Sequence, residues 1–304
     1  MDLALLWWNV GLRAGAGKPA PDSKRKPVLG AIADVCKDLG YDVIGLCEVS
    51  EADVAHLEAA VKDYGFSLVS FQDKFGQLRF DMCLLYRSSK LSVISRTRKA
   101  IVDSSIRRKK LKIGGSVMFE SVPHGELISI VCSHWPARMN ERHWRNPMRG
   151  TLGRALKQTY RENYEVTPYV ILMGDYNDEP HDDTLFLELE AGRDCGWALL
   201  NNCLYNPFWR HLGGDFSPVS MSQSTRHGSY SYPKTLPQQD WWMFDQIIFS
   251  PAFLGLQNWV LDEARTGVLD IGDLQSPDSE NSLTGIKMDH LPVYSRVIRS
   301  LTHD

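Results

Sequence analysis

The sequence predicts an α/β fold in one domain that spans residues 1–304. Several apolar runs are unbroken and end in polar residues, which is typical of strands that are buried on both faces. Segments with helical spacing lie between these runs, and no low-complexity linker or internal repeat divides the chain. In layered α/β folds ligands bind at the carboxyl ends of strands, so the polar residues there are the first candidates for function.

The composition is that of a globular protein. Hydrophobic residues make up 43% of the chain, which is enough for a sizeable core, and no apolar run approaches the thickness of a bilayer. The first residues lack the basic start and the cleavage site of a secretion signal. The six cysteines form no C-x-x-C pair, and we expect reduced thiols in the core. We therefore expect a soluble, cytoplasmic protein that is not bound to a membrane.

The charge is unevenly distributed along the chain. The formal net charge of -3 does not suggest a histone-like binder of polyanions. However, Arg96–Lys112 holds eight Lys or Arg residues and one acid. Likewise, Arg138–Arg161 holds seven Lys or Arg residues and one acid. These two basic segments indicate a local anionic partner.

The first two apolar runs each end in a residue that can bind a metal or a phosphate. Leu3–Val10 predicts a strand that ends near Asn9, whose amide either binds a metal-bound water or a phosphate oxygen, or simply forms a turn. Asp42–Val49 predicts a buried strand that ends in the carboxylate of Glu48. An unpaired carboxylate in that position is costly, so it must reach water or a cation. Because Mg²⁺ takes one or two carboxylates, Glu48 is our first candidate for a metal ligand.

Helices and a loop are predicted around these strands. Gly11–Pro27 is basic and contains Gly and Pro, and we predict a mobile loop that touches phosphates or is merely solvated. Val28–Leu39 has helical spacing. Ser50–Tyr64 predicts a second helix, with Ser50 as its N-cap and Asp53 three residues later.

The next part of the chain is predicted to be largely β, because its apolar runs alternate in part with polar residues. The predicted strands are Phe66–Ser70, Phe80–Tyr86, Ser92–Ile101, Lys112–Ser121 and Leu127–Cys132. One acid, Asp81, lies among apolar neighbours in the second of them. Asp81 either orients a catalytic histidine or pairs with Arg79.

A third strand end carries His134 and Arg138. Both side chains can donate hydrogen bonds to phosphate oxygens, although a single His is more often structural than catalytic. A helix is predicted over Arg142–Arg161, starting near a proline that only a first turn tolerates. Its basic residues form either a solvated face or a track along a polyanion, with Arg149 and Arg154 as the candidates for substrate contact.

The central motif is the strand Val170–Met173 and the turn that follows it. Gly174 allows the backbone to turn. Asp175 and Asn177 are separated by one residue and can point to the same side, where an acid orients a water and an amide holds an oxygen. The other reading is an ordinary turn, because Asp and Asn are common turn formers.

The last third of the chain has a long aromatic segment, Cys203–Trp242, with little periodicity. Long loops in compact domains are usually functional. Its aromatic and basic residues either stack on bases, wall a pocket or form a packed hairpin. The candidates for substrate contact here are Arg226, His227, Tyr230, Tyr232 and Trp241.

Two further strands are predicted near the end of the chain. Phe244–Ser250 carries an acid, Asp245, in its second position. Asp289 and His290 precede the last strand, Val293–Ile298.

The ordered set of these motifs resembles the endonuclease/exonuclease/phosphatase superfamily. That superfamily includes pancreatic-type deoxyribonucleases, abasic-site endonucleases, inositol polyphosphate 5-phosphatases, deadenylases and neutral sphingomyelinases. The resemblance extends from Leu3 to Ile298, and the Gly228-Ser229-Tyr230 stretch is similar to a bacterial branch. Two features depart from the pattern: Met288 stands where Ser is usual, and no Trp-Asp-Arg signature precedes Ile247.

The resemblance implies a four-layer α/β sandwich, with two central, mostly antiparallel β-sheets flanked by helices, and a site that needs Mg²⁺ or Mn²⁺. At the metal it implies Glu48 as a ligand, Asn9 beside the metal or the phosphate, and Asp289 as a further acid. The implied catalytic residues are Asp175 for the attacking water, Asn177 for the transition state, His290 held by Asp245, and His134 held by Asp81.

The basic segments and the aromatic segment favour a nuclease that cleaves DNA. A phosphatase or phosphodiesterase that acts on a small phosphoester or a lipid headgroup is the alternative within the same fold, because a shared site does not select the substrate. A non-catalytic nucleic-acid-binding module is a third possibility. The sequence does not indicate an oligomeric state.

Overall fold

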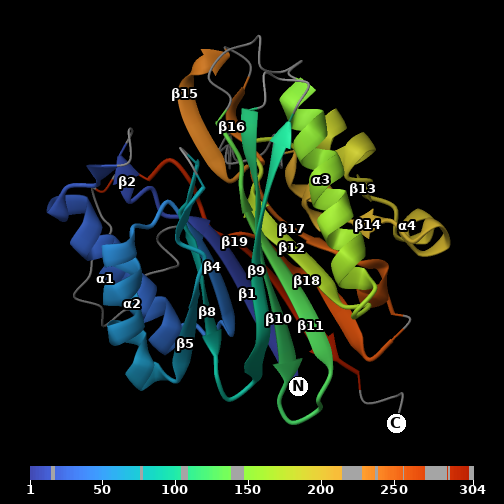
Figure 1. Cartoon of the computed structure of the whole chain (residues 1–304), viewed down its shortest axis with the longest axis horizontal. Helices are drawn as coiled ribbons and strands as arrows, with labels where there is room; N and C mark the ends of the chain where they lie inside the picture. The colour runs from blue at the N-terminus through green and yellow to red at the C-terminus, as the bar shows by residue number, and fades with distance from the viewer. Residues whose placement is uncertain are drawn as a thin grey trace, which may run out of the picture.

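Two β-sheets lie face to face in the computed structural model, and helices cover their outer surfaces (Figure 1). The structure describes residues 1–14, 18–75, 78–103, 109–137, 147–213, 228–236, 239–255, 257–270, 286 and 288–300. This arrangement confirms the predicted four-layer α/β sandwich. No helix in these ranges is both long enough and apolar enough to cross a bilayer.

The first sheet has six strands in the order β18-β19-β1-β4-β8-β5. Their bounds are β1 Asp2–Asn9, β4 Val43–Cys47, β5 Phe66–Ser70, β8 Met82–Arg87, β18 Trp259–Val268 and β19 Val293–Arg299. Within it β1 and β4 pair in parallel, so their carboxyl ends meet at one edge. Helices α1 (Asp22–Asp38) and α2 (Glu51–Val61) pack on its outer face against Leu6, Trp8 and Ile44.

The second sheet has seven strands in the order β13-β14-β17-β12-β11-β10-β9. Their bounds are β9 Leu91–Asp103, β10 Lys109–Ser121, β11 Leu127–His134, β12 Val170–Asp175, β13 Ala191–Gly192, β14 Leu204–Tyr205 and β17 Asp245–Phe249. Here β11 and β12 pair in parallel, as do the two-residue strands β13 and β14. Helix α3 (Pro147–Tyr164) covers the outer face of this sheet with Leu152 and Leu156.

The main core lies between the two sheets. Successive side chains of a strand point to opposite faces, so Leu5 and Trp7 of β1 point inward while Leu6 and Trp8 point towards α1. The inward residues of β1 share one buried cluster with Met173 of β12. The β1–β4 and β11–β12 pairs are therefore apolar on both faces, as the unbroken apolar runs of these strands predict.

Smaller elements surround the ends of the strands. They are β2 Arg13–Ala14, β3 Lys18–Pro19, β6 Asp73–Phe75, β7 Leu78–Phe80, β15 Tyr230–Leu236, β16 Gln239–Trp242, α4 Cys195–Asn201, and the short turns η2 Lys62–Tyr64, η4 Thr184–Glu188, η5 Pro207–His211 and η6 Pro251–Phe253. The strands β15 and β16 pair as a hairpin.

Two local predictions were wrong. The segment Gly11–Pro27 is not one loop, because α1 already begins at Asp22 and accommodates Pro27 inside its second turn. Strand β18 was not predicted, since five of its ten residues are only partly buried, two are exposed, and a register shift interrupts its pairing with β19. The predicted capping box of α2 is present, with the Ser50 side chain and the Asp53 backbone bonded to each other. The six cysteines are free thiols, and four of them are buried.

Candidate active site

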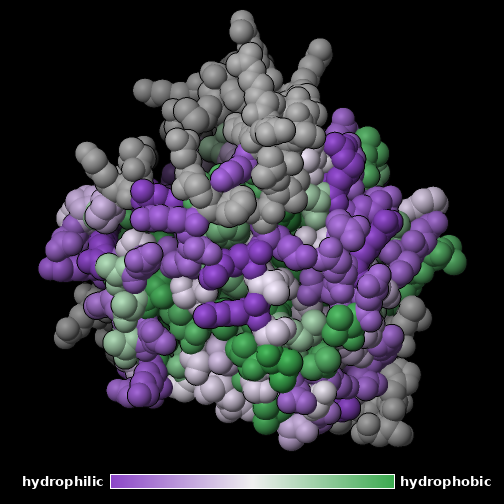
Figure 2. All heavy atoms as spheres, viewed as in Figure 1, coloured by the Kyte–Doolittle hydropathy of each residue, from purple (hydrophilic) through white to green (hydrophobic). Residues whose placement is uncertain are grey.

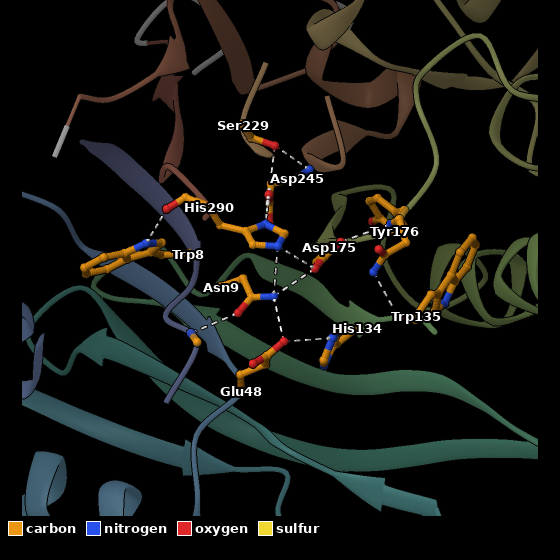
Figure 3. A network of polar contacts seen from close by, with 12 residues as sticks. Trp8, Asn9, Glu48, His134, Trp135, Asp175, Tyr176, Ser229, Asp245 and His290 are labelled. Carbon is orange, nitrogen blue, oxygen red and sulfur yellow. Dashed lines mark hydrogen bonds and ion pairs between the residues drawn. The ribbon is translucent and has the colours of Figure 1, made fainter. Parts of the chain in front are cut away.

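The carboxyl ends of the β1–β4 and β11–β12 pairs meet at one place in the sandwich (Figure 3). Asn9 ends β1 and Glu48 follows β4 in the first sheet, while His134 and Asp175 end β11 and β12 in the second. The Asn9 Nδ2 donates to Glu48 Oε1 at 3.2 Å and to Asp175 Oδ2 at 2.9 Å. One side-chain amide therefore joins the functional ends of both sheets.

The turn after β12 fixes the position of Asp175. A Cβ on Gly174 would lie 2.5 Å from the carbonyl oxygen of Ser133, so only glycine allows β12 to pass β11 here. Asn177 has a φ of 51°, and its backbone N–H donates to Asp175 Oδ1 at 3.0 Å. Its side-chain Nδ2 donates to the carbonyl of Trp135 at 3.0 Å. The Oδ2 of Asp175 is left facing Asn9 and the centre of the site.

Asp175 is 1% exposed, and this burial raises its pKa. The nearby carboxylate of Asp245 raises the pKa further, while His290 and His134 oppose the rise. A general base works best when its pKa is near the working pH, and an ordinary exposed Asp is too acidic for that. The environment of Asp175 therefore suits a residue that accepts a proton from water.

His290 lies beside Asp175 and is held by a buried acid. Its Nδ1 is 2.7 Å from Asp245 Oδ2, and its Nε2 is 3.7 Å from Asp175 Oδ2. Asp245 also accepts hydrogen bonds from Trp7 Nε1 at 3.1 Å and from Ser229 Oγ at 2.8 Å. Burial lowers the pKa of His290, but Asp245 and Asp175 raise it more, to about 10. The ring is thus a fixed imidazolium that presents Nε2–H to the centre of the site.

His134 forms a second pair of the same kind. Its Nδ1 lies 3.1 Å and 3.2 Å from the two carboxylate oxygens of Asp81. Its Nε2 points towards Glu48, at 3.9 Å from Oε1. Burial lowers the pKa of His134, Asp81 raises it and Lys112 lowers it, with a net rise. Burial raises the pKa of Asp81, but His134 and Lys112 together hold it well below its usual range.

The donor set at the centre suits a hard divalent cation. Glu48 has a φ of 59°, which turns its carboxylate to the site, where its side chain is 28% exposed. Among the described residues its Oε2 makes no hydrogen bond, so it is available as a ligand. Asp175 and Asp245 add carboxylate oxygens within 4.8 Å of one another, whereas His290, which belongs to the same cluster, is protonated and does not ligate an ion. Oxygen donors with this excess of carboxylates fit Mg²⁺ or Mn²⁺.

Two of the predicted metal-site residues, Asn9 and Asp289, do not present an oxygen to the centre of the site. The Oδ1 of Asn9 accepts from the Gly11 backbone N–H at 3.1 Å, so its amide nitrogen, rather than its oxygen, faces the carboxylates. Asp289 is exposed, and its Oδ1 would lie 3.5 Å from a Cβ on Gly11. Asp289 is therefore at the mouth of the site, beside the loop that follows β1.

Arg149 supports the site from within the protein, contrary to our expectation that it contacts substrate. It is 5% exposed and donates to the carbonyls of Pro136, Tyr176 and Asn177 at 3.1, 3.2 and 2.6 Å. Its Nε also donates to Asp178 at 2.9 Å. The guanidinium thus ties the loop after β11 to the turn after β12.

The remaining predicted contacts are at the periphery. Arg154 is exposed on α3, where hydrophilic residues gather, and pairs with Glu188 at 2.7 Å (Figure 2). The Tyr230 ring lies 4.5 Å from that of His290 and 5.2 Å from that of Phe244, between centroids. Trp241 pairs with Ser231 in the β15–β16 hairpin. Arg138, Arg226, His227 and the side chain of Tyr232 lie outside what the structure describes.

Sequence reasoning missed four residues that support the two Asp–His pairs. Trp7 and Ser229 bond to Asp245, while Lys112 and Arg13 lie beside Asp81. Trp7 was read as a core residue because it lies in an apolar run. The available signal was its indole N–H, which needs an acceptor when it is buried.

A family model for the Endonuclease/Exonuclease/phosphatase family matches residues 6–266. The chain belongs to this family. The match confirms the predicted superfamily, whose members are hydrolases of phosphoesters. The protein is accordingly a phosphoesterase.

Three solved structures illustrate the shared fold. The human Nocturnin catalytic domain with bound sulfate has a TM-score of 0.62 at 14% identity, with 98% of this chain and 95% of that chain covered. The mannosyl-6-phosphatase Bt3783 of Bacteroides thetaiotaomicron has a TM-score of 0.63 at 14% identity, with 97% and 99% covered. D. rerio TDP2 complexed with a single-strand DNA product has a TM-score of 0.56 at 16% identity, with 97% and 98% covered. No curated protein sequence matches this chain significantly.

Proposed function

We propose that the protein is a nuclease that needs Mg²⁺ or Mn²⁺ and cleaves DNA by attack of water on phosphorus. The observation that carries this proposal is the convergence of an acid–amide centre with two Asp–His pairs. Asn9 links Glu48 to Asp175, and the Nε2 atoms of both histidines point to this centre (Figure 3). Hydrolysis of a phosphodiester needs an activated water, positive charge near the phosphoryl oxygens and a proton for the leaving oxygen.

The residues divide these tasks among themselves. Asp175, whose pKa is raised by burial, accepts the proton of the attacking water. His290 stays charged through Asp245 and donates a hydrogen bond or a proton from Nε2. His134 does the same from the opposite side. A divalent cation held by Glu48 supplies Lewis acidity at the phosphoryl oxygens when it is bound. The stabilisation of the transition state by Asn177 stays a prediction.

Two hairpins beside the site support a polymeric substrate. Because Gly115 pairs with Cys132, Lys112 lies just past the end of β11, and the paired strands β9 and β10 continue beyond the site to Asp103 and Lys109. The sequence of this segment is basic. On another side, β15 is joined to His290 by a backbone bridge at Tyr230. Both hairpins reach the same end of the sandwich (Figure 1). Cations that extend away from the reacting centre suit the phosphate backbone of DNA. The DNA product bound to D. rerio TDP2 shows that this fold accommodates such a strand.

A panel assay with Mg²⁺ tests the proposal. The substrates are supercoiled DNA, single-stranded DNA, RNA, inositol phosphates and bis(p-nitrophenyl) phosphate, and the matched inactive variant is His290→Ala. We expect the wild type to nick DNA, with binding that weakens as salt rises. Turnover of the inositol phosphates alone would instead establish a small-molecule phosphatase, as the mannosyl-6-phosphatase relative suggests. Binding of DNA with no metal-dependent turnover of any substrate would indicate a non-catalytic module.

A further inference from the structure

Arg13 is a largely buried cation without a matching acceptor. Its side chain is 13% exposed, and its Nη1 is 3.8 Å from Asp81 Oδ2, which is too long for a hydrogen bond. In the part of the chain that the structure describes, this guanidinium makes no hydrogen bond at all. A guanidinium offers five N–H donors, and withdrawing them from water is unfavourable unless an anion receives them.

The corner around Asp81 carries more positive than negative charge. Lys112 Nζ bonds to Asp81 Oδ1 at 2.7 Å, and His134 bonds to the same carboxylate. Arg13 and Lys112 both lie within 4 Å of Asp81, so two cationic side chains and one imidazole share a single carboxylate. The Lys112 and Asp81 side chains are each 11% exposed, so water compensates this excess only in part.

This corner is adjacent to the proposed reacting centre but distinct from it. The His134 ring has Nδ1 on Asp81 and Nε2 towards Glu48. The Asp81 carboxylate and the His134 ring therefore stand between Arg13 and Lys112 on one side and the centre on the other. A group bound to them would be a close neighbour of the phosphate under attack, as the next phosphate of a nucleic acid strand is.

We propose that Arg13 and Lys112 form a subsite for a second phosphate of the substrate, next to the one that is hydrolysed. The inference rests on the proposed function and names its substrate class: a phosphodiester that carries a neighbouring phosphate. Arg suits this role because its planar fork binds two phosphate oxygens at once, while Lys adds a point charge. The neighbouring phosphate is either an internucleotide or a terminal one, and substrates that carry one or the other distinguish these sources.

The test compares short thymidine oligonucleotides that differ in the phosphates beside the scissile bond. TpT has no second phosphate, whereas pTpT and TpTp carry one on the 5′ or the 3′ side, and pTpTpT adds an internucleotide one. We expect kcat/KM for cleavage between the nucleosides to be at least tenfold higher for one phosphorylated substrate than for TpT. Arg13→Gln should lower that preference at least tenfold, and Arg13→Lys should restore part of it. The control Lys62→Gln, at the exposed end of α2, should retain the wild-type preference.

The same variants separate failure of the subsite from failure of the proposed function. If the wild type cleaves the dinucleotides and Arg13→Gln lowers kcat/KM for TpT and pTpT by the same factor, the subsite is refuted and the nuclease stands. If the wild type cleaves neither these substrates nor supercoiled DNA, the nuclease proposal fails. Binding of fluorescently labelled pTpTpT to Asp175→Asn then tests the subsite alone: adding Arg13→Gln should weaken it tenfold and reduce its salt dependence by about 0.7 in the log–log slope. An unchanged affinity and slope would refute the subsite as well.

Discussion

Replacing Asp245 by Asn tests how the buried acid controls His290. The substitution keeps the size of the side chain and removes its charge. Asp245 Oδ1 accepts from Trp7, while Oδ2 accepts from both Ser229 and His290. An Asn that keeps the Trp7 bond places its amide nitrogen against His290 Nδ1. The amide nitrogen of Asn is a donor, so His290 Nδ1 must then accept its hydrogen bond. The buried His290 ring therefore becomes neutral.

The expected cost follows from what His290 loses. Asp245 is the largest of the influences that raise the pKa of His290 to about 10, whereas burial lowers it. Without that carboxylate the ring is no longer a charged donor, and positioned acid–base groups are typically worth about 10²–10⁴-fold in rate. We expect kcat of Asp245→Asn to fall in this range. The matched variant Ser229→Ala keeps the charge of Asp245 but removes the hydroxyl that donates to Asp245 Oδ2 and accepts from the Asp245 backbone N–H. If this change costs the transition state about 1.4 kcal/mol, which is the scale of a hydrogen bond, kcat falls by only about tenfold.

The assay is steady-state hydrolysis of bis(p-nitrophenyl) phosphate with Mg²⁺, together with urea unfolding to show that each variant is folded. The order wild type, Ser229→Ala, Asp245→Asn is the expected order of decreasing kcat. An Asp245→Asn variant within threefold of wild type would refute the reasoning. So would a Ser229→Ala variant that is slower than Asp245→Asn.

Three further outcomes follow from the contacts. Arg149→Met removes the ion pair to the buried Asp178 and the donors to three backbone carbonyls. Unfolding should therefore become easier by about 3–5 kcal/mol in urea titrations, with kcat reduced more than KM is raised. Glu48→Gln should raise the Mg²⁺ concentration needed for half-maximal activity at least tenfold in a metal titration. Burial raises the pKa of Glu126, but Asn258, Arg299 and Trp259 lower it more, so its stabilisation is present above about pH 4.5 and is lost as pH falls below that value. The melting temperature of Glu126→Gln should therefore fall less than that of wild type between pH 6 and pH 3.

The sequence alone indicated that Glu48 and Asp175 would lie close together, because the signal that points to each of them is local. Glu48 and Asp175 follow apolar runs that fit strands buried on both faces, and parallel neighbouring strands bring such ends together. The order of the motifs then added Asp245 and His290, which are adjacent only through the fold. Their contact at 2.7 Å joins β17 to the segment before β19.

The supporting residues could not be predicted in the same way. Arg149 lies on a helix with many basic residues, and helical spacing shows which face it occupies but not that its guanidinium reaches the turn after β12. Arg13 was counted among the basic residues of a solvated or phosphate-binding loop, whereas the fold places it beside Asp81. Such contacts depend on the relative positions of the two sheets. Neither strand periodicity nor turn chemistry contains that information.

The central claim is that side chains from both sheets build one site for phosphoester hydrolysis. Its most direct test is Mg²⁺-dependent turnover by purified Asp175→Asn, compared with wild type. Matching circular dichroism spectra of the two proteins show that the variant is folded. We expect a folded variant whose rate is lower by about 10³-fold or more, because the group that accepts the proton of water is gone. Turnover close to that of wild type would contradict it.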